Sequence, residues 1–151
     1  MDIIRAEPGQ AGELTQIAMA AKAHWGYPEH WMKLWGPQLT ITPEYIRANE
    51  VWAIRNPDEL AGFYSLSGPG QTGFLENLWV LPGYMRQGAG RQMFIHALTR
   101  CRTLGYRSVR IEADPHAQGF YERMGARKIG EHASLLEGRP RILPVLELEL
   151  E

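Results

Sequence analysis

The stretch VLPGYMRQGAGRQM, residues 80–93, combines residue types that can hold an anion. An apolar, strand-like segment leads through small residues into a helical pattern without any acidic side chain. At such a junction the first N–H groups of the helix lack carbonyl partners and add to the positive end of the helix dipole. Gly88 and Gly90 would let phosphate oxygens approach the backbone, and Arg86 and Arg91 flank the turn. The stretch therefore predicts an anion cradle.

Two nucleotide-binding motifs do not fit this turn. The third glycine of G-x-G-x-x-G is replaced by Met93, and no Lys-Ser/Thr pair follows the glycines as it does in a P-loop. A short G-x-G turn is also a common way to connect a strand tightly to a helix. By itself the turn leaves phosphate binding and a simple connection equally open.

A second motif follows in EADPHAQGFYERMGARKIGE, residues 112–131. Asp114-Pro115 supplies an N-cap and a first-turn proline for a short helix closed by Gly125. Taken together, VLPGYMRQGAG (80–90) and AQGFYERMG (117–125) resemble the GNAT superfamily of N-acetyltransferases. Its central motif is a strand, then R/Q-x-x-G-x-G/A and a helix, followed by A-x-x-F-Y-x-x-x-G. The resemblance covers about residues 50–135, and the flanking segments also fit the family plan.

The resemblance implies acetyl-CoA as the acetyl donor, with its pyrophosphate on the glycine turn and its pantetheine arm paired against the preceding strand. Two positions depart from the family pattern: Met85 stands where Arg or Gln is usual, and Asp114 where many relatives carry Asn. Met85 is expected to act through its backbone N–H, and a charged aspartate cannot donate a hydrogen bond to pantetheine. The cofactor-binding residues implied are Leu78, Trp79, Val80, Met85, Arg86, Gln87, Gly88, Ala89, Gly90, Arg91, Asp114, Ala117, Phe120 and Tyr121.

Three catalytic roles follow from the same resemblance. Glu76 occupies the position of the general base, acting directly or through water, and the Val80 N–H would stabilise the oxyanion. Tyr121 matches the tyrosine that protonates the departing thiolate. Each side chain also has an ordinary explanation: Glu76 as a solvent-facing strand residue, and Tyr121 as a core aromatic in a helix stripe with Ala117, Phe120 and Met124.

The acceptor side is the least defined. In the family, the early helices and the connection between the last strands line it, and here the early helices are dense in aromatic residues that could cage an ammonium group or pack a small core. The substrate-binding candidates are Trp25, Tyr27 and Trp31, with His24, His30, Trp35 and Tyr45 nearby. The segment EGRPRILP, residues 137–144, would be a loop whose two arginines meet an acidic substrate, a dimer mate or water.

Periodicity predicts the elements that must position these residues. Strands are expected at 2–7, 50–56, 60–68, 74–81, 107–113, about 127–135 and 142–150, the second and third of them antiparallel around Asn56-Pro57-Asp58. Helices are expected at 10–24, at 28–48 with a break at Gly36-Pro37, at about 88–104 with Gly105 as its C′ residue, and after Asp114. The expected fold class is α/β (α+β): a GNAT fold with a mixed, mostly antiparallel sheet of six to seven strands and about four helices.

Composition limits the class of protein further. A chain of 151 residues fits one domain, 1–151, and a net charge of −1 gives no global attraction to nucleic acid or an anionic membrane. The single Cys101 shares a predicted buried helix face with Phe94, Ala97, Leu98 and Leu104, so we expect a core thiol. The five histidines lack metal-ligand spacing, and we expect no metal. Without a signal-like or membrane-spanning segment in the sequence, we expect a cytoplasmic protein.

The sequence therefore favours an N-acetyltransferase that moves the acetyl group of acetyl-CoA to a primary amine of a small molecule or peptide by direct attack in a ternary complex. The alternative is a non-catalytic acyl-CoA-binding or regulatory module of the same fold. The identity of the amine stays open, and so does a homodimer.

Overall fold

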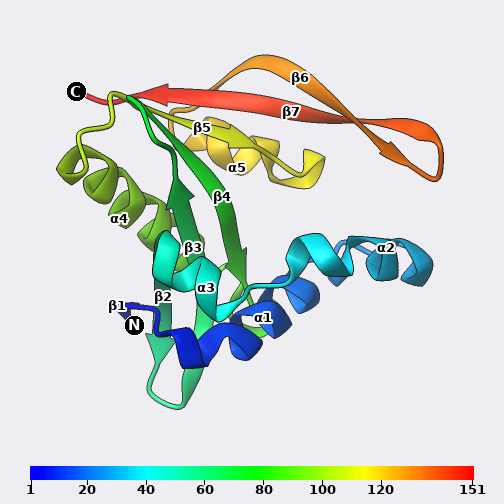
Figure 1. The fold of residues 1–151 in the computed structure, drawn as a ribbon, viewed down its shortest axis with the longest axis horizontal. Coiled ribbons are helices and arrows are strands. Elements are labelled where there is room, and N and C mark those ends of the chain that lie inside the picture. Colours follow the sequence, from blue (N-terminus) through cyan, green and yellow to red (C-terminus); the bar gives the residue numbers. More distant parts are fainter. The chain divides into compact units, whose positions relative to one another are not determined.

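The computed structural model describes residues 1–151 and contains seven strands and five α-helices (Figure 1). The strands are β1 (Asp2–Arg5), β2 (Glu50–Asn56), β3 (Glu59–Ser67), β4 (Thr72–Val80), β5 (Ser108–Glu112), β6 (Arg127–Leu136) and β7 (Arg139–Glu149). The α-helices are α1 (Ala11–Ala23), α2 (Glu29–Leu39), α3 (Pro43–Ala48), α4 (Ala89–Thr103) and α5 (Gln118–Arg123). Three 3-10 helices are η1 (Pro8–Gln10), η2 (Pro82–Tyr84) and η3 (Pro115–Ala117).

The strands form a seven-stranded sheet in the order β1-β2-β3-β4-β5-β7-β6. Of the pairings described here, β4 with β5 is parallel, and β1 with β2, β2 with β3, β5 with β7 and β6 with β7 are antiparallel. The predicted mixed, mostly antiparallel α/β fold is confirmed. The chain forms two compact units, one made of residues 1–66 and 77–96 and the other of residues 67–76 and 97–151.

The first unit has its core around β3, which is buried from Leu60 to Leu66. Such a continuous buried run is typical of a strand covered on both faces. Residues at helical spacing on α1 are buried with it: Leu14, Ile17, Ala18 and Ala21. The turn at residues 57–58 joins β2 to β3 as predicted, with a bulge at Ile54/Arg55.

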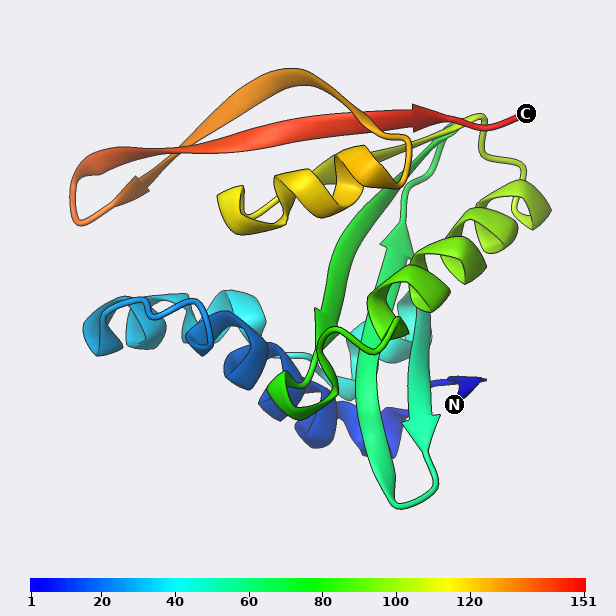
Figure 2. The same cartoon turned by 180° about the vertical axis from the view of Figure 1, so that it is seen from behind.

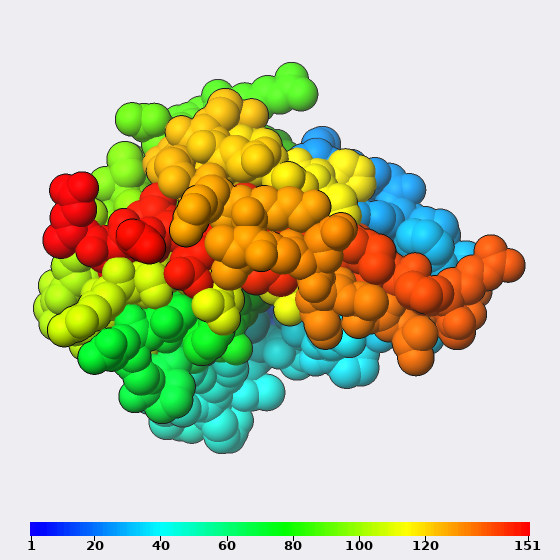
Figure 3. Space-filling view, turned by 90° about the horizontal axis from the view of Figure 1, so that it is seen from above, coloured from blue at the N-terminus to red at the C-terminus, as the bar shows by residue number.

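The second unit is organised by β7, which pairs with β5 on one side and β6 on the other. Leu146 is fully buried, and α5 contacts both strands of the β6–β7 hairpin, along which it lies in both ribbon views (Figures 1 and 2). Atoms of the hairpin, orange and red, form much of the face seen in Figure 3. β6 is the edge strand of the sheet and is mostly exposed.

Both predicted glycine helix ends are present. After α4, Gly105 has φ +85° and the Tyr106 N–H donates to the Cys101 carbonyl at 2.9 Å. After α5, Gly125 has φ +102°, and the Ala126 N–H donates to the Tyr121 carbonyl at 3.0 Å. These are the 6→1 bonds of a Schellman motif, which needs a residue with positive φ.

Local predictions are wrong at three places. Pro37 lies inside α2, and the break comes at residues 40–42, because Thr42 caps a new helix by accepting the Tyr45 N–H and is followed by a proline. Residues 137–144 are not a loop: the turn is Glu137-Gly138 alone, with φ 53° and 76°, as a two-residue hairpin turn requires. Leu104 lies beyond the end of α4 and is 42% exposed.

No helix is long and apolar enough to span a bilayer. No group of three or more His, Cys, Asp or Glu side chains is arranged to hold a metal ion. Cys101 is buried and forms no disulfide, in line with a core thiol.

Candidate active site

The glycine turn between β4 and α4 has the backbone of an anion cradle. Two residues adopt left-handed conformations, Arg86 with φ +64° and Gly88 with φ +85°. The first helical hydrogen bond of α4 runs from the Gln92 N–H to the Gly88 carbonyl at 2.9 Å. The N–H groups of residues 89–91 therefore precede the helical bonding pattern and are available to a ligand at the helix start.

Packing holds this turn in place. η2 begins with a proline, and the Gln87 side-chain amide donates to the Gly83 carbonyl at 3.2 Å across the turn. Ala89 and Met93 are buried, so the first turn of α4 is anchored in the core of its unit. The Met85 N–H donates to the Pro82 carbonyl at 3.3 Å, so the group expected to replace the missing Arg/Gln is already engaged in η2.

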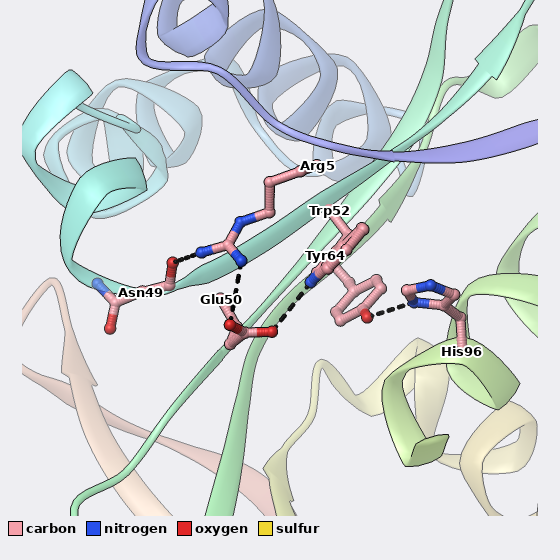
Figure 4. Close-up of polar contacts among 6 residues, drawn as sticks. All are labelled: Arg5, Asn49, Glu50, Trp52, Tyr64 and His96. Carbon is pink, nitrogen blue, oxygen red and sulfur yellow. Dashed lines mark hydrogen bonds and ion pairs between the residues drawn. The ribbon is translucent and has the colours of Figure 1, made fainter. Parts of the chain in front are cut away.

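A second anchor lies further along α4, where His96 meets strands β2 and β3 (Figure 4). The buried Tyr64 hydroxyl is 2.6 Å from His96 Nδ1, and the Trp52 ring lies 4.8 Å from the imidazole. Trp52 donates through Nε1 to Glu50, whose carboxylate also accepts from Arg5 at 3.1 Å. These contacts fix α4 against the strands and thereby orient its N-terminus.

The end of β4 approaches β3 very closely. A Cβ built on Gly62 would lie 2.4 Å from the Trp79 carbonyl oxygen and 3.3 Å from Val80 Cα, so only glycine fits there. The Leu81 N–H donates to the Ala61 carbonyl at 2.8 Å beside this contact. The backbone proposed for pantetheine pairing and oxyanion stabilisation is thus set by a glycine that sequence reasoning missed.

Side chains on the same strands form a hydrogen-bonded series. Trp79 donates through Nε1 to Asn77 at 2.9 Å, Asn77 donates to the fully buried Ser65 at 2.9 Å, and the Ser65 hydroxyl is 2.9 Å from that of Tyr45. Tyr45 had been considered only as one of the acceptor-side aromatics. The signal in the sequence is a serine and an asparagine that lie next to apolar residues in two strands, because their polar groups need partners when buried.

Glu76 lies in the second unit, on the exposed side of β4 together with Phe74. An exposed carboxylate can accept a proton from a substrate that arrives from solvent. The same exposure is also expected of an ordinary surface residue on a strand. Its neighbour in sequence, Asn77, points to the other face of the strand, as alternation requires.

Tyr121 is more buried than expected. It is 5% exposed and is more buried than Ala117, Phe120 and Met124 of the same stripe, and its ring contacts Phe120 at a centroid distance of 5.2 Å. Burial raises the pKa of the Tyr121 phenol, because the charged form loses its solvation. The phenol is therefore held neutral and is a weaker acid than a free tyrosine.

Asp114 is engaged at both carboxylate oxygens. Oδ1 accepts from the His116 backbone N–H and lies 2.9 Å from His116 Nδ1, and Oδ2 accepts from Arg141 Nη2 at 3.4 Å. Arg141, predicted to lie in a loop, instead reaches Asp114 from β7. The pantetheine contact expected from an asparagine at this position is not available from this carboxylate, which can only accept hydrogen bonds.

Aromatic rings of α2 and of the connection that precedes it lie against Lys22 of α1. The Lys22 ammonium lies 4.1 Å from the centroid of the Trp35 ring and 5.3 Å from that of Tyr27. Tyr27 contacts both Trp31 and Trp35, at centroid distances of 6.0 and 4.9 Å. The cage that the sequence suggested for a substrate ammonium is thus formed around Lys22 at Tyr27 and Trp35.

The two remaining aromatic candidates differ in exposure. Trp25 is 39% exposed and stands edge-on to His24 at a centroid distance of 5.8 Å. Trp31 is half-buried and also contacts His30. These rings stay candidates for acceptor contact.

A family model of the GNAT acetyltransferase family matches residues 13–126, which include both motifs. This chain belongs to the GNAT acetyltransferase family. The uncharacterized N-acetyltransferase YvbK of Bacillus subtilis is 29% identical over 96 residues, 60% of this chain and 61% of that protein, and another Bacillus subtilis protein named as an acetyltransferase is matched over 50% of its length.

Solved GNAT structures share the fold over almost the whole chain. A GCN5-related N-acetyltransferase from Rhodopseudomonas palustris aligns with a TM-score of 0.82 at 17% identity, covering 99% of this chain and 95% of that one. PaiA N-acetyltransferase from Thermoplasma acidophilum, solved in complex with coenzyme A, aligns with a TM-score of 0.76 at 16% identity, covering 98% of each chain. At such identities the likeness concerns the GNAT fold.

Proposed function

We propose that this chain is an N-acetyltransferase that transfers the acetyl group of acetyl-CoA to a primary amine of a small molecule or peptide, acting as one domain over residues 1–151. The observation that carries the proposal is the start of α4, where left-handed Arg86 and Gly88 turn the backbone into the unpaired N–H groups of the helix. A Cβ on Gly88 would have nothing within 4 Å, so the space in front of the turn is open to a ligand.

Acetyl-CoA fits these residues chemically. Its pyrophosphate is an anion of the size that a helix N-terminus binds, and the exposed Arg86 and Arg91 add positive charge at the rim. The family assignment and the coenzyme A complex of the PaiA relative support the same donor. Leu78, Trp79 and Val80 would then pair with the pantetheine arm.

The transfer needs two kinds of proton movement. A lysine-like amine with a pKa of ~10.4 is almost fully protonated at pH 7, and removing that proton costs about 4.6 kcal/mol. We assign this step to Glu76, directly or through water. The neutral nitrogen attacks the thioester carbonyl, the oxyanion is stabilised by the Val80 N–H, and the C–S bond breaks as the thiolate takes a proton from Tyr121.

The buried environment of Tyr121 is compatible with this role. Desolvation that weakens the phenol as an acid also destabilises a thiolate released beside it, so the free energy of transfer depends on the difference between the two. The same burial supports the alternative function, a non-catalytic acyl-CoA-binding module in which Tyr121 is a core residue.

The deciding experiment is a panel of primary amines assayed with acetyl-CoA by release of free thiol, combined with calorimetric titration of acetyl-CoA. Binding together with amine-dependent thiol release supports the transferase. Tight binding without release for any amine supports the binding module, and absence of binding refutes both.

A further inference from the structure

Asp114, His116 and Arg141 form a cluster of charged and titratable groups that the proposed mechanism does not yet use. The Asp114 side chain is 8% exposed, Arg141 is 16% exposed and His116 is 43% exposed. A carboxylate this buried needs a compensating positive charge, which the Arg141 guanidinium supplies at 3.4 Å. Asp114 is therefore a fixed anion at the start of η3.

This anion sets the tautomer of His116. An ionised carboxylate only accepts hydrogen bonds, so the 2.9 Å contact between Asp114 Oδ1 and His116 Nδ1 requires a proton on Nδ1. In the neutral imidazole the lone pair then lies on Nε2. The backbone N–H of His116 donates to the same Oδ1 at 2.9 Å, so the carboxylate holds both the backbone and the ring of His116.

An aspartate behind an imidazole is the arrangement that prepares histidine as a general base, because it fixes both tautomer and orientation. The exposure of His116 leaves its ring reachable from solvent, in contrast to the buried Tyr121. His116 faces the Asp114 carboxylate on its own turn, and the Arg141 guanidinium from β7 is held against that carboxylate. From β6 the titratable His132 bonds to Glu112 instead.

The chemistry of acetyl transfer has a place for such a base. Converting an ammonium to an amide removes two protons from nitrogen, and Glu76 accounts for the first. We propose that His116, positioned by Asp114, is the general base that removes the second proton. The inference rests on the proposed transferase function and on the motif that places Asp114 and Ala117, on either side of His116, at the pantetheine.

The second proton leaves the nitrogen after that nitrogen has attacked the carbonyl. Its N–H bond breaks, Nε2–H forms, and the electron pair stays on nitrogen as the C–S bond breaks and the thiolate is protonated by Tyr121. The imidazolium then releases its proton to solvent, and Tyr121 regains one from solvent. The net result is one amide, one CoA thiol and one proton released per turnover.

The test compares His116→Gln with His132→Gln. The two histidines lie in the same unit, and each has Nδ1 2.9 Å from a carboxylate oxygen, but His132 and Glu112 are both about half exposed. We expect kcat to fall by about 10²- to 10⁴-fold in His116→Gln, the range for a general base, with acetyl-CoA affinity and Tm little changed. His132→Gln should match the wild type.

A second variant examines the positioning role of Asp114. Asp114→Asn still caps η3 but no longer fixes one tautomer, so kcat should fall by at least about tenfold. Long-range ¹H–¹⁵N NMR of His116 should show the Nδ1–H tautomer in the wild type and a mixture in Asp114→Asn.

Several outcomes overturn the inference. Wild-type kcat in His116→Gln does so, and so does a loss of acetyl-CoA affinity as large as the loss of kcat, which would make His116 part of the binding wall. A wild-type protein that releases no thiol with any amine refutes the transferase and this role together. In that case the NMR tautomer still reports whether the Asp114–His116 pair is formed.

Discussion

Gly62→Ala should displace the backbone of β4 at the proposed reaction centre. The new methyl group would lie 2.4 Å from the Trp79 carbonyl oxygen, whereas ordinary van der Waals contact begins at 3.4 Å, so the strands must separate locally by about 1 Å. The Met93 methyl at 3.0 Å is the end of a flexible side chain and can move aside. The Trp79–Val80 backbone cannot move without carrying the Val80 N–H with it.

A displacement of this size at a catalytic group costs on the order of 10²-fold in rate, and we expect kcat to fall by about that factor. Acetyl-CoA affinity should fall less, because the glycine turn is untouched. Overpacking should also cost about 1–3 kcal/mol of stability, or roughly 2–12 °C in Tm. On one preparation, thiol release at 25 °C measures kcat, calorimetry at 25 °C measures acetyl-CoA affinity, and thermal unfolding measures Tm.

The matched control is Gly12→Ala in α1, where an added Cβ has nothing within 4 Å. It should stabilise the protein by about 0.5–1 kcal/mol and leave the kinetics unchanged. If folded Gly62→Ala shows the loss of Tm but turns over within twofold of the wild type, the Trp79–Val80 backbone is not part of the reaction centre.

Four further changes test other parts of the molecule. Gly88→Asn tolerates the left-handed φ of +85° but adds a side chain in front of the turn, so calorimetry should show acetyl-CoA binding weakened at least about tenfold; equal affinity would make the turn a mere connection. Glu76→Gln should lower the rate most at low pH and much less above about pH 9, and a uniform loss would indicate positioning instead. Tyr121→Phe should lower kcat by roughly 10²- to 10⁴-fold with Tm nearly unchanged, whereas a large drop in Tm would assign the phenol to the core. Because burial raises the pKa of Tyr121, wild-type stability should hold below about pH 10 and fall above it by up to about 1.4 kcal/mol per pH unit, and Tyr121→Phe should lose that alkaline slope in denaturant titrations. Lys22→Met should keep the aromatic cluster folded but lose the cation–π contacts, lowering stability by about 0.5–2 kcal/mol in the same titrations, and no change would show that the ammonium is merely accommodated.

The fold could be predicted from the sequence because its signals are local and strong. Apolar runs bounded by turn residues mark β2 and β3, alternation marks the end of β7, helical spacing marks α1 and α4, and glycines with positive φ end both α4 and α5. The glycine turn and the F-Y motif could be found because each depends on a few residues close together in the chain. The predicted family follows from these two motifs and is confirmed.

Contacts between distant residues could not be predicted in this way. Gly62 gives no sign in the sequence that it packs on Trp79, and a lysine such as Lys22 reads as a surface residue until the rings of Tyr27 and Trp35 are placed around it. Arg141 is expected in a loop, but β7 runs from Arg139 to Glu149 and includes both Pro140 and Pro144. The roles of Glu76, Val80 and Tyr121 stay predictions that kinetics must test.

The burial of Lys22 has a consequence for the protein as a target of its own chemistry. The chain has only three lysines, Lys22, Lys33 and Lys128, while its other thirteen basic residues are arginines, which are not acetyl acceptors of this kind. With the Lys22 amine covered by two aromatic rings, Lys33 and Lys128 are the lysine amines left at the surface. If amines are the acceptors, as we propose, a chain with so few exposed lysines offers little competition through self-acetylation.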